Sequence, residues 1–189
     1  EILQALKTGA LKKDVIDMAL SRILQAKEKL AAIKNMEADY SGNISISKAI
    51  SEKSITLIKS KAGVLPIKDI AQTKVIFAGD ESLYRNSILK NKSQDAIKNI
   101  LIIAIFTSVS AWKGSSGIDR EEQKKIKRLI SEAENSIVIS FGSPYVLRYF
   151  TRADVLIAAY EPSEQAQEAA IRCLKGEIEF NGKLPVRLF

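Results

Sequence analysis

The sequence contains no histidine and only one cysteine, and these two shortages exclude several kinds of chemistry. Without an imidazole there is no Ser-His-Asp or Cys-His nucleophile, and the commonest zinc ligand is missing. Cys173 has no second cysteine with which to form an internal disulfide, and dispersed carboxylates provide no spacing typical of a metal site. We therefore expect no metal and no cofactor, and we interpret Cys173 as a buried structural thiol.

Long apolar runs are also missing. None approaches the roughly 20 residues that cross a bilayer, so we expect no membrane span. The net charge is +7, from 29 Lys and Arg against 22 Asp and Glu. This excess is scattered over expected helices, and its densest run, 124–128, contains no aromatic residue. Nucleic-acid binding requires a clustered basic surface, so we expect no nucleic-acid partner.

The chain does contain apolar runs that alternate with helical segments, an order typical of a parallel α/β sheet. We expect strands at 55–58, 75–79, 100–106, 137–141, 155–159 and 184–188, with an extended edge segment at 64–67. The expected helices cover about 45–53, 81–91 and 119–134, a short stretch from Pro144, and 163–176. Run 100–106 is the most apolar and is predicted to be the central strand. Right-handed crossovers then produce a three-layer α/β/α sandwich with a mostly parallel sheet.

The beginning of the chain differs from the rest. Apolar residues recur there at spacings of three and four, which predicts a helix with one apolar stripe after a shorter helix that ends at Gly9. We expect helices within 1–36, a polar linker at 37–43, and the sandwich domain over 44–189.

One connection within the expected sandwich domain is too short. The polar residues that precede Asn99 leave no room for another strand and helix. Either the domain lacks this unit, or a disordered stretch is missing from the sequence near 91–97, and we favour the missing stretch. An intact mass of the source protein equal to the 20.8 kDa of this chain would contradict that expectation.

The loop after run 100–106 is the expected place for a ligand, because ligands of open α/β sheets bind at the carboxyl ends of strands. It contains Lys113-Gly114-Ser115-Ser116-Gly117, whose spacing matches neither a P-loop nor Gly-x-Gly-x-x-Gly. Trp112 in this loop can stack on a sugar or pack against a neighbouring domain. The candidate substrate-proximal residues are Trp112, Lys113, Ser115, Ser116, Asp119 and Arg120.

Asp80 and Glu81 form an adjacent acidic pair after an expected strand. Glycoside hydrolysis uses two carboxyl groups about 5–10 Å apart, but neighbours at a strand-to-helix turn point in different directions. Carboxylates at a helix N-terminus are also stabilised by the helix dipole. We interpret this pair as structural and expect no catalytic residue in the chain.

Several short motifs, in a fixed order along nearly the whole chain, resemble the C-terminal region of family 3 glycoside hydrolases. They are Val15-Ile16-Asp17, Arg22-Ile23-Leu24 with Lys27, Ser54 to Lys59, Leu65-Pro66-Ile67, Phe141 to Tyr145, Ala158 to Glu161, Glu168-Ala169-Ala170 and Gly182 to Val186. The resemblance implies that residues 1–36 are the closing helices of an upstream (β/α)8-type barrel. The catalytic nucleophile of such an enzyme belongs to that barrel.

A departure from the family pattern favours one branch. In the β-glucosidase branch the resemblance implies a catalytic Glu just before an Asp-Arg pair, but residues 114–118, which precede Asp119-Arg120, contain no carboxylate. The β-N-acetylglucosaminidase branch takes its acid/base from a barrel loop and is the better match. The resemblance thus implies a parent enzyme that removes terminal N-acetylglucosamine from cell-wall or related glycans through an Asp nucleophile. This chain would be its non-catalytic C-terminal domain, which supports the barrel and contributes a loop to the cleft.

Two other functions are consistent with the same residues. The chain could be a stand-alone doubly wound module that binds a nucleotide or a sugar, or a surface for assembly alone. On the family hypothesis its partners are the upstream barrel and, through the parent enzyme, a carbohydrate. We expect the chain by itself to be inactive, and we leave open whether the bacterial parent works in the cell envelope or in the cytoplasm.

Overall fold

The computed structural model describes residues 1–32, 41–70, 73–92, 99–108 and 117–189. The chain divides into two compact units, Glu1–Ser41 and Gly42–Phe189. No helix among the described residues is both long enough and apolar enough to cross a membrane. Most of the predicted linker at 37–43 lies outside the described residues.

The first unit consists of α1 (Ile2–Lys7) and α2 (Lys13–Ala32), which agree with the two predicted helices. Gly9 lies between them with a φ of 74°, a left-handed conformation that glycine adopts without strain. No side chain described in these two helices is buried. Large apolar side chains that are about half exposed or more are Ile2, Leu3, Val15, Met18, Leu20, Ile23, Leu24 and Leu30.

The second unit is built on a five-stranded sheet with the order β1-β5-β4-β3-β2. The strands are β1 (Thr56–Ser60), β2 (Thr73–Gly79), β3 (Ile100–Phe106), β4 (Asn135–Phe141) and β5 (Val155–Ala158). Strands β2 to β5 run parallel, and β1 pairs antiparallel with β5. The mostly parallel sheet is therefore confirmed. The prediction that run 100–106 is the central strand is wrong, because only β2 lies beyond β3 whereas β4 occupies the middle.

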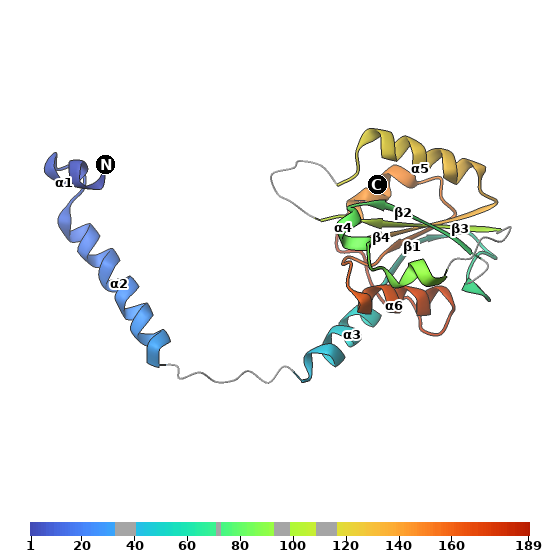
Figure 1. The fold of residues 1–189 in the computed structure, drawn as a ribbon, viewed down its shortest axis with the longest axis horizontal. Coiled ribbons are helices and arrows are strands. Elements are labelled where there is room, and N and C mark those ends of the chain that lie inside the picture. Colours follow the sequence, from blue (N-terminus) through green and yellow to red (C-terminus); the bar gives the residue numbers. More distant parts are fainter. Residues whose placement is uncertain (33–40, 71–72, 93–98, 109–116) are drawn as a thin grey trace. The chain divides into compact units, whose positions relative to one another are not determined.

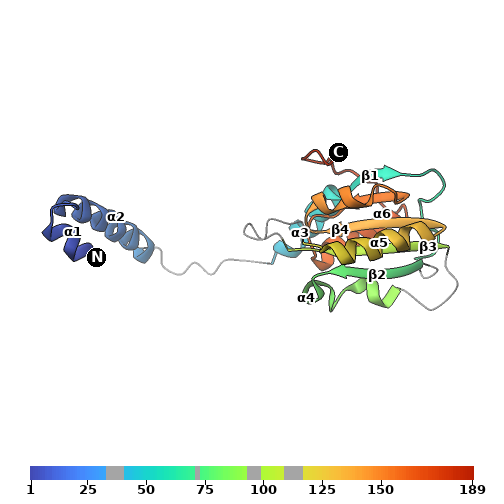
Figure 2. The same cartoon turned by 90° about the horizontal axis from the view of Figure 1, so that it is seen from above.

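Helices cover both faces of this sheet, as Figures 1 and 2 show, so the three-layer sandwich is confirmed. The helices are α3 (Asn43–Ser54), α4 (Glu81–Tyr84), η2 (Ile88–Lys92), α5 (Arg120–Glu132), η3 (Pro144–Phe150) and α6 (Glu164–Leu174), where η marks a 3-10 helix. An ion pair between Arg172 of α6 and Glu52 of α3 helps to attach α3 to α6.

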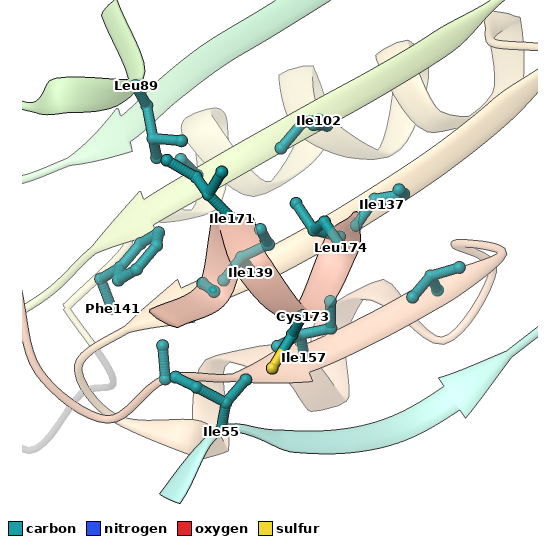
Figure 3. Close-up of a cluster of buried hydrophobic side chains, with 14 of the residues drawn as sticks. Ile55, Leu89, Ile102, Ile137, Ile139, Phe141, Ile157, Ile171, Cys173 and Leu174 are labelled. Atoms are coloured by element: carbon teal, nitrogen blue, oxygen red, sulfur yellow. The ribbon is translucent and has the colours of Figure 1, made fainter. Parts of the chain in front are cut away.

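Two apolar clusters hold the layers together, one on each face of the sheet. On one face, α6 and η2 pack on residues that alternate along β3, β4 and β5. Figure 3 shows Leu174 of α6 beside Ile137 of β4, and Ile171 of α6 beside Leu89 of η2. On the opposite face, α5 and η3 cover the intervening residues of the same strands. The strands are buried on both faces, which explains their continuous apolar runs.

The crossovers do not all have the same hand. Each parallel connection from β2 to β5 moves in one direction along the sheet. The connections through α5 and η3 lie on one face, whereas η2, between β2 and β3, packs on the other face. The β2-to-β3 connection therefore has the opposite hand to the other two. Parallel crossovers are nearly always right-handed, so the predicted uniform right-handedness fails at this connection.

Three local predictions are corrected by the structure. Residues 64–67 are not a strand: Val64 and Ile67 are buried as a loop whose Ile67 N–H donates to the Leu174 carbonyl over 2.7 Å. Residues 184–188 also form no strand: the N–H of Gly182 donates to the carbonyl of Ile55, just before β1, over 3.0 Å, and the chain bends at Pro185, which has no N–H for a strand ladder. The helix expected over 81–91 is divided into α4 and η2.

Candidate functional site

The carboxyl ends of β2 and β3, the beginning of α5, and η3 surround a pocket of about 720 Å³. We call it the edge pocket. Its walls include Gly79 and Asp80 after β2, Ser108 after β3, Asp119 and Glu122 at α5, and Tyr149 of η3. Because β2 and β3 are parallel, residues that follow them meet at one edge of the sheet. The position agrees with the general location of ligand sites in open α/β sheets.

A backbone-to-carboxylate hydrogen bond closes one wall of the edge pocket. The N–H of Gly79 donates to Glu122 Oε1 over 2.8 Å, which links the end of β2 to the first turn of α5. Gly79 has a φ of 89°, and a Cβ here would overlap the carbonyl oxygen of Phe106. Only glycine permits this close approach of β2 to β3 at the pocket.

Buried Thr107, directly after β3, connects the segments beside the edge pocket. Its Oγ1 accepts a hydrogen bond from the Ser143 N–H over 3.1 Å, which joins the end of β3 to the turn after β4. A Cβ on Gly142 would overlap the Thr107 carbonyl, and one on Gly117 would lie 2.9 Å from the Thr107 Cβ. Gly142 therefore packs against the backbone of Thr107, and Gly117 packs against its side chain.

The two aspartates of the edge pocket are helix caps. Asp80 Oδ1 accepts from the Ser82 N–H over 3.0 Å, and Asp119 Oδ1 accepts from the Glu122 N–H over 2.8 Å. Asp80 therefore has the structural role that we expected, and Asp119 is the N-cap of α5. The Glu122 carboxylate, three residues after the Asp119 cap, accepts from the Gly79 N–H.

The pocket has a negative electrostatic environment. Burial raises the pKa of the nearby Tyr84 phenol, and the charges of Glu81, Glu122 and Asp80 raise this pKa further. Arg120 is the cationic side chain that lines the pocket among the residues the structure describes. Such a wall suits neutral polar ligands better than anions, because carboxylates repel negative charge and accept hydroxyl donors.

The structure places only some of the predicted site residues. Asp119 and Arg120 line the edge pocket, as their position after the β3 loop suggested. Trp112, Lys113, Ser115 and Ser116 lie outside the described residues. Sequence reasoning missed Gly79, Glu122 and Tyr149 as pocket residues. A glycine directly after a buried strand was the available signal for Gly79, whereas nothing local places Tyr149 beside α5.

No set of three or more His, Cys, Asp or Glu side chains that could hold a metal ion occurs in the described ranges. Cys173 is buried, its Sγ lies 3.6 Å from the Glu179 carbonyl oxygen, and burial raises its pKa to about 11. A thiol with this pKa is protonated at neutral pH and is a poor nucleophile, which agrees with its structural interpretation.

No protein-family model matches the chain, and no curated protein sequence does either. Solved structures do match it, and over almost its whole length. Beta-glucoside phosphorylase BglX aligns with a TM-score of 0.77 and 20% identity, over 99% of this chain and 41% of that chain. The likeness is one of fold.

Two further matches carry names that refer to one glycosidase family. A fungal multi-domain GH3 beta-N-acetylglucosaminidase aligns with a TM-score of 0.74 and 21% identity, over 99% of this chain and 25% of that one. A glycoside hydrolase family 3 beta-N-acetylglucosaminidase from Paenibacillus sp. str. FPU-7 aligns with a TM-score of 0.71 and 17% identity, over 98% and 42%. The chain thus spans less than half of each of these three structures.

Proposed function

We propose that this chain is the non-catalytic C-terminal part of a family 3 glycoside hydrolase, from its β-N-acetylglucosaminidase branch. Residues 1–36 are then the closing helices of the upstream barrel, 37–43 the linker, and 44–189 the sandwich domain. The parent enzyme removes terminal N-acetylglucosamine from cell-wall or related glycans. The sandwich domain supports the barrel, and residues 112–120 contribute to the substrate cleft.

The observation that carries this proposal is the extent of the fold similarity. The alignments cover 98–99% of the chain, so they include α1 and α2 as well as the sandwich. A stand-alone α/β module would have no reason to share both a sandwich and a preceding helical segment with multi-domain glycosidases. The covered share of those structures leaves room for a further large domain in the parent.

The edge pocket supports a non-catalytic role for the chain. Asp80 and Asp119 hold helix N-termini, and Glu122 accepts from the Gly79 N–H. All three carboxylates therefore accept hydrogen bonds from backbone N–H groups, and they hold the beginnings of α4 and α5 and the end of β2 in place. The chemistry is therefore assigned to the barrel.

Uncovered apolar surfaces support an additional domain. On α3, Ile44, Ile46 and Ile50 are 71%, 58% and 61% exposed, and a groove of about 450 Å³ runs beside Ile46, Ile50 and Tyr160. The apolar stripe of α2 is equally uncovered. Clustered exposed apolar residues mark interaction surfaces, and we assign the barrel of the parent enzyme as their partner.

The decisive experiment compares the purified chain 1–189 with the parent protein that contains the barrel. We expect the parent to hydrolyse an aryl β-N-acetylglucosaminide and the chain to show no turnover above buffer. Assays of the parent with the matching aryl β-glucoside, with and without phosphate, distinguish the β-N-acetylglucosaminidase branch from glucosidase and phosphorylase activity. Turnover by residues 1–189 alone contradicts the non-catalytic assignment, and a parent that prefers the glucoside contradicts the branch.

One observation favours a second candidate, a stand-alone module that binds a sugar. The edge pocket has the position and size of a ligand site and offers hydroxyl-binding carboxylates. Calorimetry of the isolated chain with N-acetylglucosamine tests this candidate. Stoichiometric binding, together with a full-length protein that contains no barrel, would support it.

A further inference from the structure

A second groove lies between α5 and the end of η3 and has a volume of about 470 Å³. We call it the basic groove. Three cationic side chains line it, Lys127 and Arg128 from α5 and Arg152 from the turn after η3. No carboxylate belongs to its described lining, in contrast to the edge pocket. The two neighbouring sites therefore differ in the sign of their charge.

Two of these cations are available to a ligand. Arg128 is paired with Glu132 one helical turn away, with Nε and Oε1 2.7 Å apart. Lys127 and Arg152 are exposed and make no ion pair or hydrogen bond with any side chain or backbone group in the described ranges. Lys59 holds the turn that carries Arg152, because its ammonium donates to the carbonyls of Thr151 and Ala153 over 2.9 and 2.7 Å.

The floor of the basic groove is apolar. Ile130 and Phe150 are 6% and 1% exposed and contribute to the lining. Tyr149 forms one wall, and its ring is held by Arg148, whose guanidinium lies 5.0 Å from the ring centre and donates to the phenol oxygen over 3.0 Å. A low-dielectric floor strengthens attraction between the cations and an anion above it. An aromatic wall beside cations suits a sugar ring with an acidic substituent.

Tyr149 also lines the edge pocket, so the two sites meet at this side chain. A glycan that is held in the edge pocket can therefore continue past Tyr149 into the basic groove. We propose that the basic groove binds a carboxylate-bearing unit of an acidic oligosaccharide through Lys127 and Arg152. This inference rests on the proposed function and adds a substrate class to it: glycans that contain acidic sugars.

The test uses the full 189-residue chain and two oligosaccharides that differ in charge. Isothermal calorimetry at low salt compares hyaluronan hexasaccharide, which alternates N-acetylglucosamine with glucuronate, with neutral chitohexaose. The groove variant is Lys127→Gln with Arg152→Gln. The control variant, Lys74→Gln with Lys125→Gln, removes two exposed cations outside this groove and so changes the net charge equally. Circular dichroism verifies that both variants keep the fold.

We expect hyaluronan to bind at least about tenfold more tightly than chitohexaose, since one or two charge-assisted hydrogen bonds are worth that factor. The groove variant should lose this preference, and the control variant should change the affinity by less than about twofold. If both variants lost the preference for hyaluronan equally, net charge alone would explain that preference, and the inference would be overturned. Failure of hyaluronan to bind, or tighter binding of a single-stranded oligothymidylate to the same groove, would also overturn it.

The two proposals fail in different assays. Binding of hyaluronan is measured without catalysis, and hydrolysis by the parent is measured on a neutral aryl N-acetylglucosaminide. An active parent whose isolated chain shows no preference for the acidic hexasaccharide contradicts only the basic-groove inference. An inactive parent whose chain binds hyaluronan through Lys127 and Arg152 contradicts only the proposed hydrolase.

Discussion

At the scale of single residues, Asp154 shows how one carboxylate can join three segments. Its Oδ2 accepts from the backbone N–H and the hydroxyl of Ser136 over 2.9 and 3.1 Å, and its Oδ1 lies 3.2 Å from the ammonium of Lys61. Burial by itself raises the pKa of Asp154, but the hydrogen bonds from Ser136 and Lys61 outweigh it, so the pKa lies below its usual value. The folded protein thus favours the ionised form.

Asp154→Asn is expected to lower the free energy of unfolding by about 1.5–3 kcal/mol at neutral pH, because charge-assisted hydrogen bonds are lost. The unfolded chain holds the Asp154 proton more tightly than the folded chain does. This contribution is therefore present above the unfolded pKa of about 3.8 and disappears as the pH falls through the lower folded value. Urea unfolding at neutral pH and at about pH 2.5 measures it.

The control is Glu168→Gln, which neutralises an exposed carboxylate on α6 that binds no described residue. It should change stability by less than about 0.5 kcal/mol at either pH. A stability difference between wild type and Asp154→Asn that persists undiminished in acid would contradict the pKa argument.

Gly142 illustrates a steric requirement at the same scale. A methyl group there would overlap the carbonyl of Thr107, so we expect Gly142→Ala to destabilise the protein by about 1–3 kcal/mol. At Gly42 an added Cβ would have no heavy atom within 4 Å, and the φ of −82° suits any residue, which makes Gly42→Ala a matched control with little effect. Thermal melts of both variants measure the difference, and equal melting temperatures would show that the turn after β4 relaxes without cost.

At the scale of an element, α5 combines a structural and a site role. Its N-cap Asp119 satisfies the Glu122 N–H, and its first turn contributes Glu122 to the bond with Gly79. The start of the helix is therefore tied to the end of β2. Its buried face, with Ile126 and Ile130, packs on the sheet, while Lys127 contributes its charge to the basic groove.

Asp119→Ala should cost about 0.5–2 kcal/mol of stability, the usual value of a lost N-cap. Asp119→Ser, which keeps an oxygen acceptor, should recover most of this loss. Urea denaturation of the two variants decides between a capping role and a purely electrostatic one. If the Ser variant is as unstable as the Ala variant, the negative charge rather than the cap stabilises α5.

At the scale of the whole molecule, two features stand out: the apolar side chains exposed on α3 and the hand of the connection from β2 to β3. The isoleucines of α3 contribute little to the core of their own unit. The connection from β2 to β3 has the less favourable hand, and restoring a strand and helix beyond β2 would make every crossover right-handed. That a stretch is missing near 91–97 stays a prediction, since most of these residues lie outside the described ranges.

Ile46→Ser with Ile50→Ser should leave the unfolding free energy of the isolated chain within about 0.5 kcal/mol of wild type, because both side chains are exposed. In the parent enzyme the same pair should lower the melting temperature, because a buried interface would then lose two apolar anchors. Lys48→Ser with Lys53→Ser on the same helix is the control. A parent that tolerates the isoleucine pair as well as the lysine pair would rule out α3 as the barrel contact.

Much of the fold follows from local sequence. The apolar runs that became β3, β4 and β5 are recognisable by themselves, since each is buried on both faces and is continuous over several residues. The caps Asp119 and Ser163 were also predictable, because capping depends on residues only two or three positions apart. The general place of the edge pocket was also predictable, because the loops that follow parallel strands meet at one edge of the sheet.

The remaining features depend on partners far apart in the chain, and only the tertiary structure decided them. The order of the strands puts β4 rather than β3 in the middle, and Glu122 binds the N–H of Gly79 across 43 residues. Residues 64–67 pack as a loop in which Val64 and Ile67 are buried, and the tail bends at Pro185 and forms no strand. Local sequence patterns determine which residues are buried or need a hydrogen-bond partner. Which residue becomes that partner depends on how the layers of the sandwich pack.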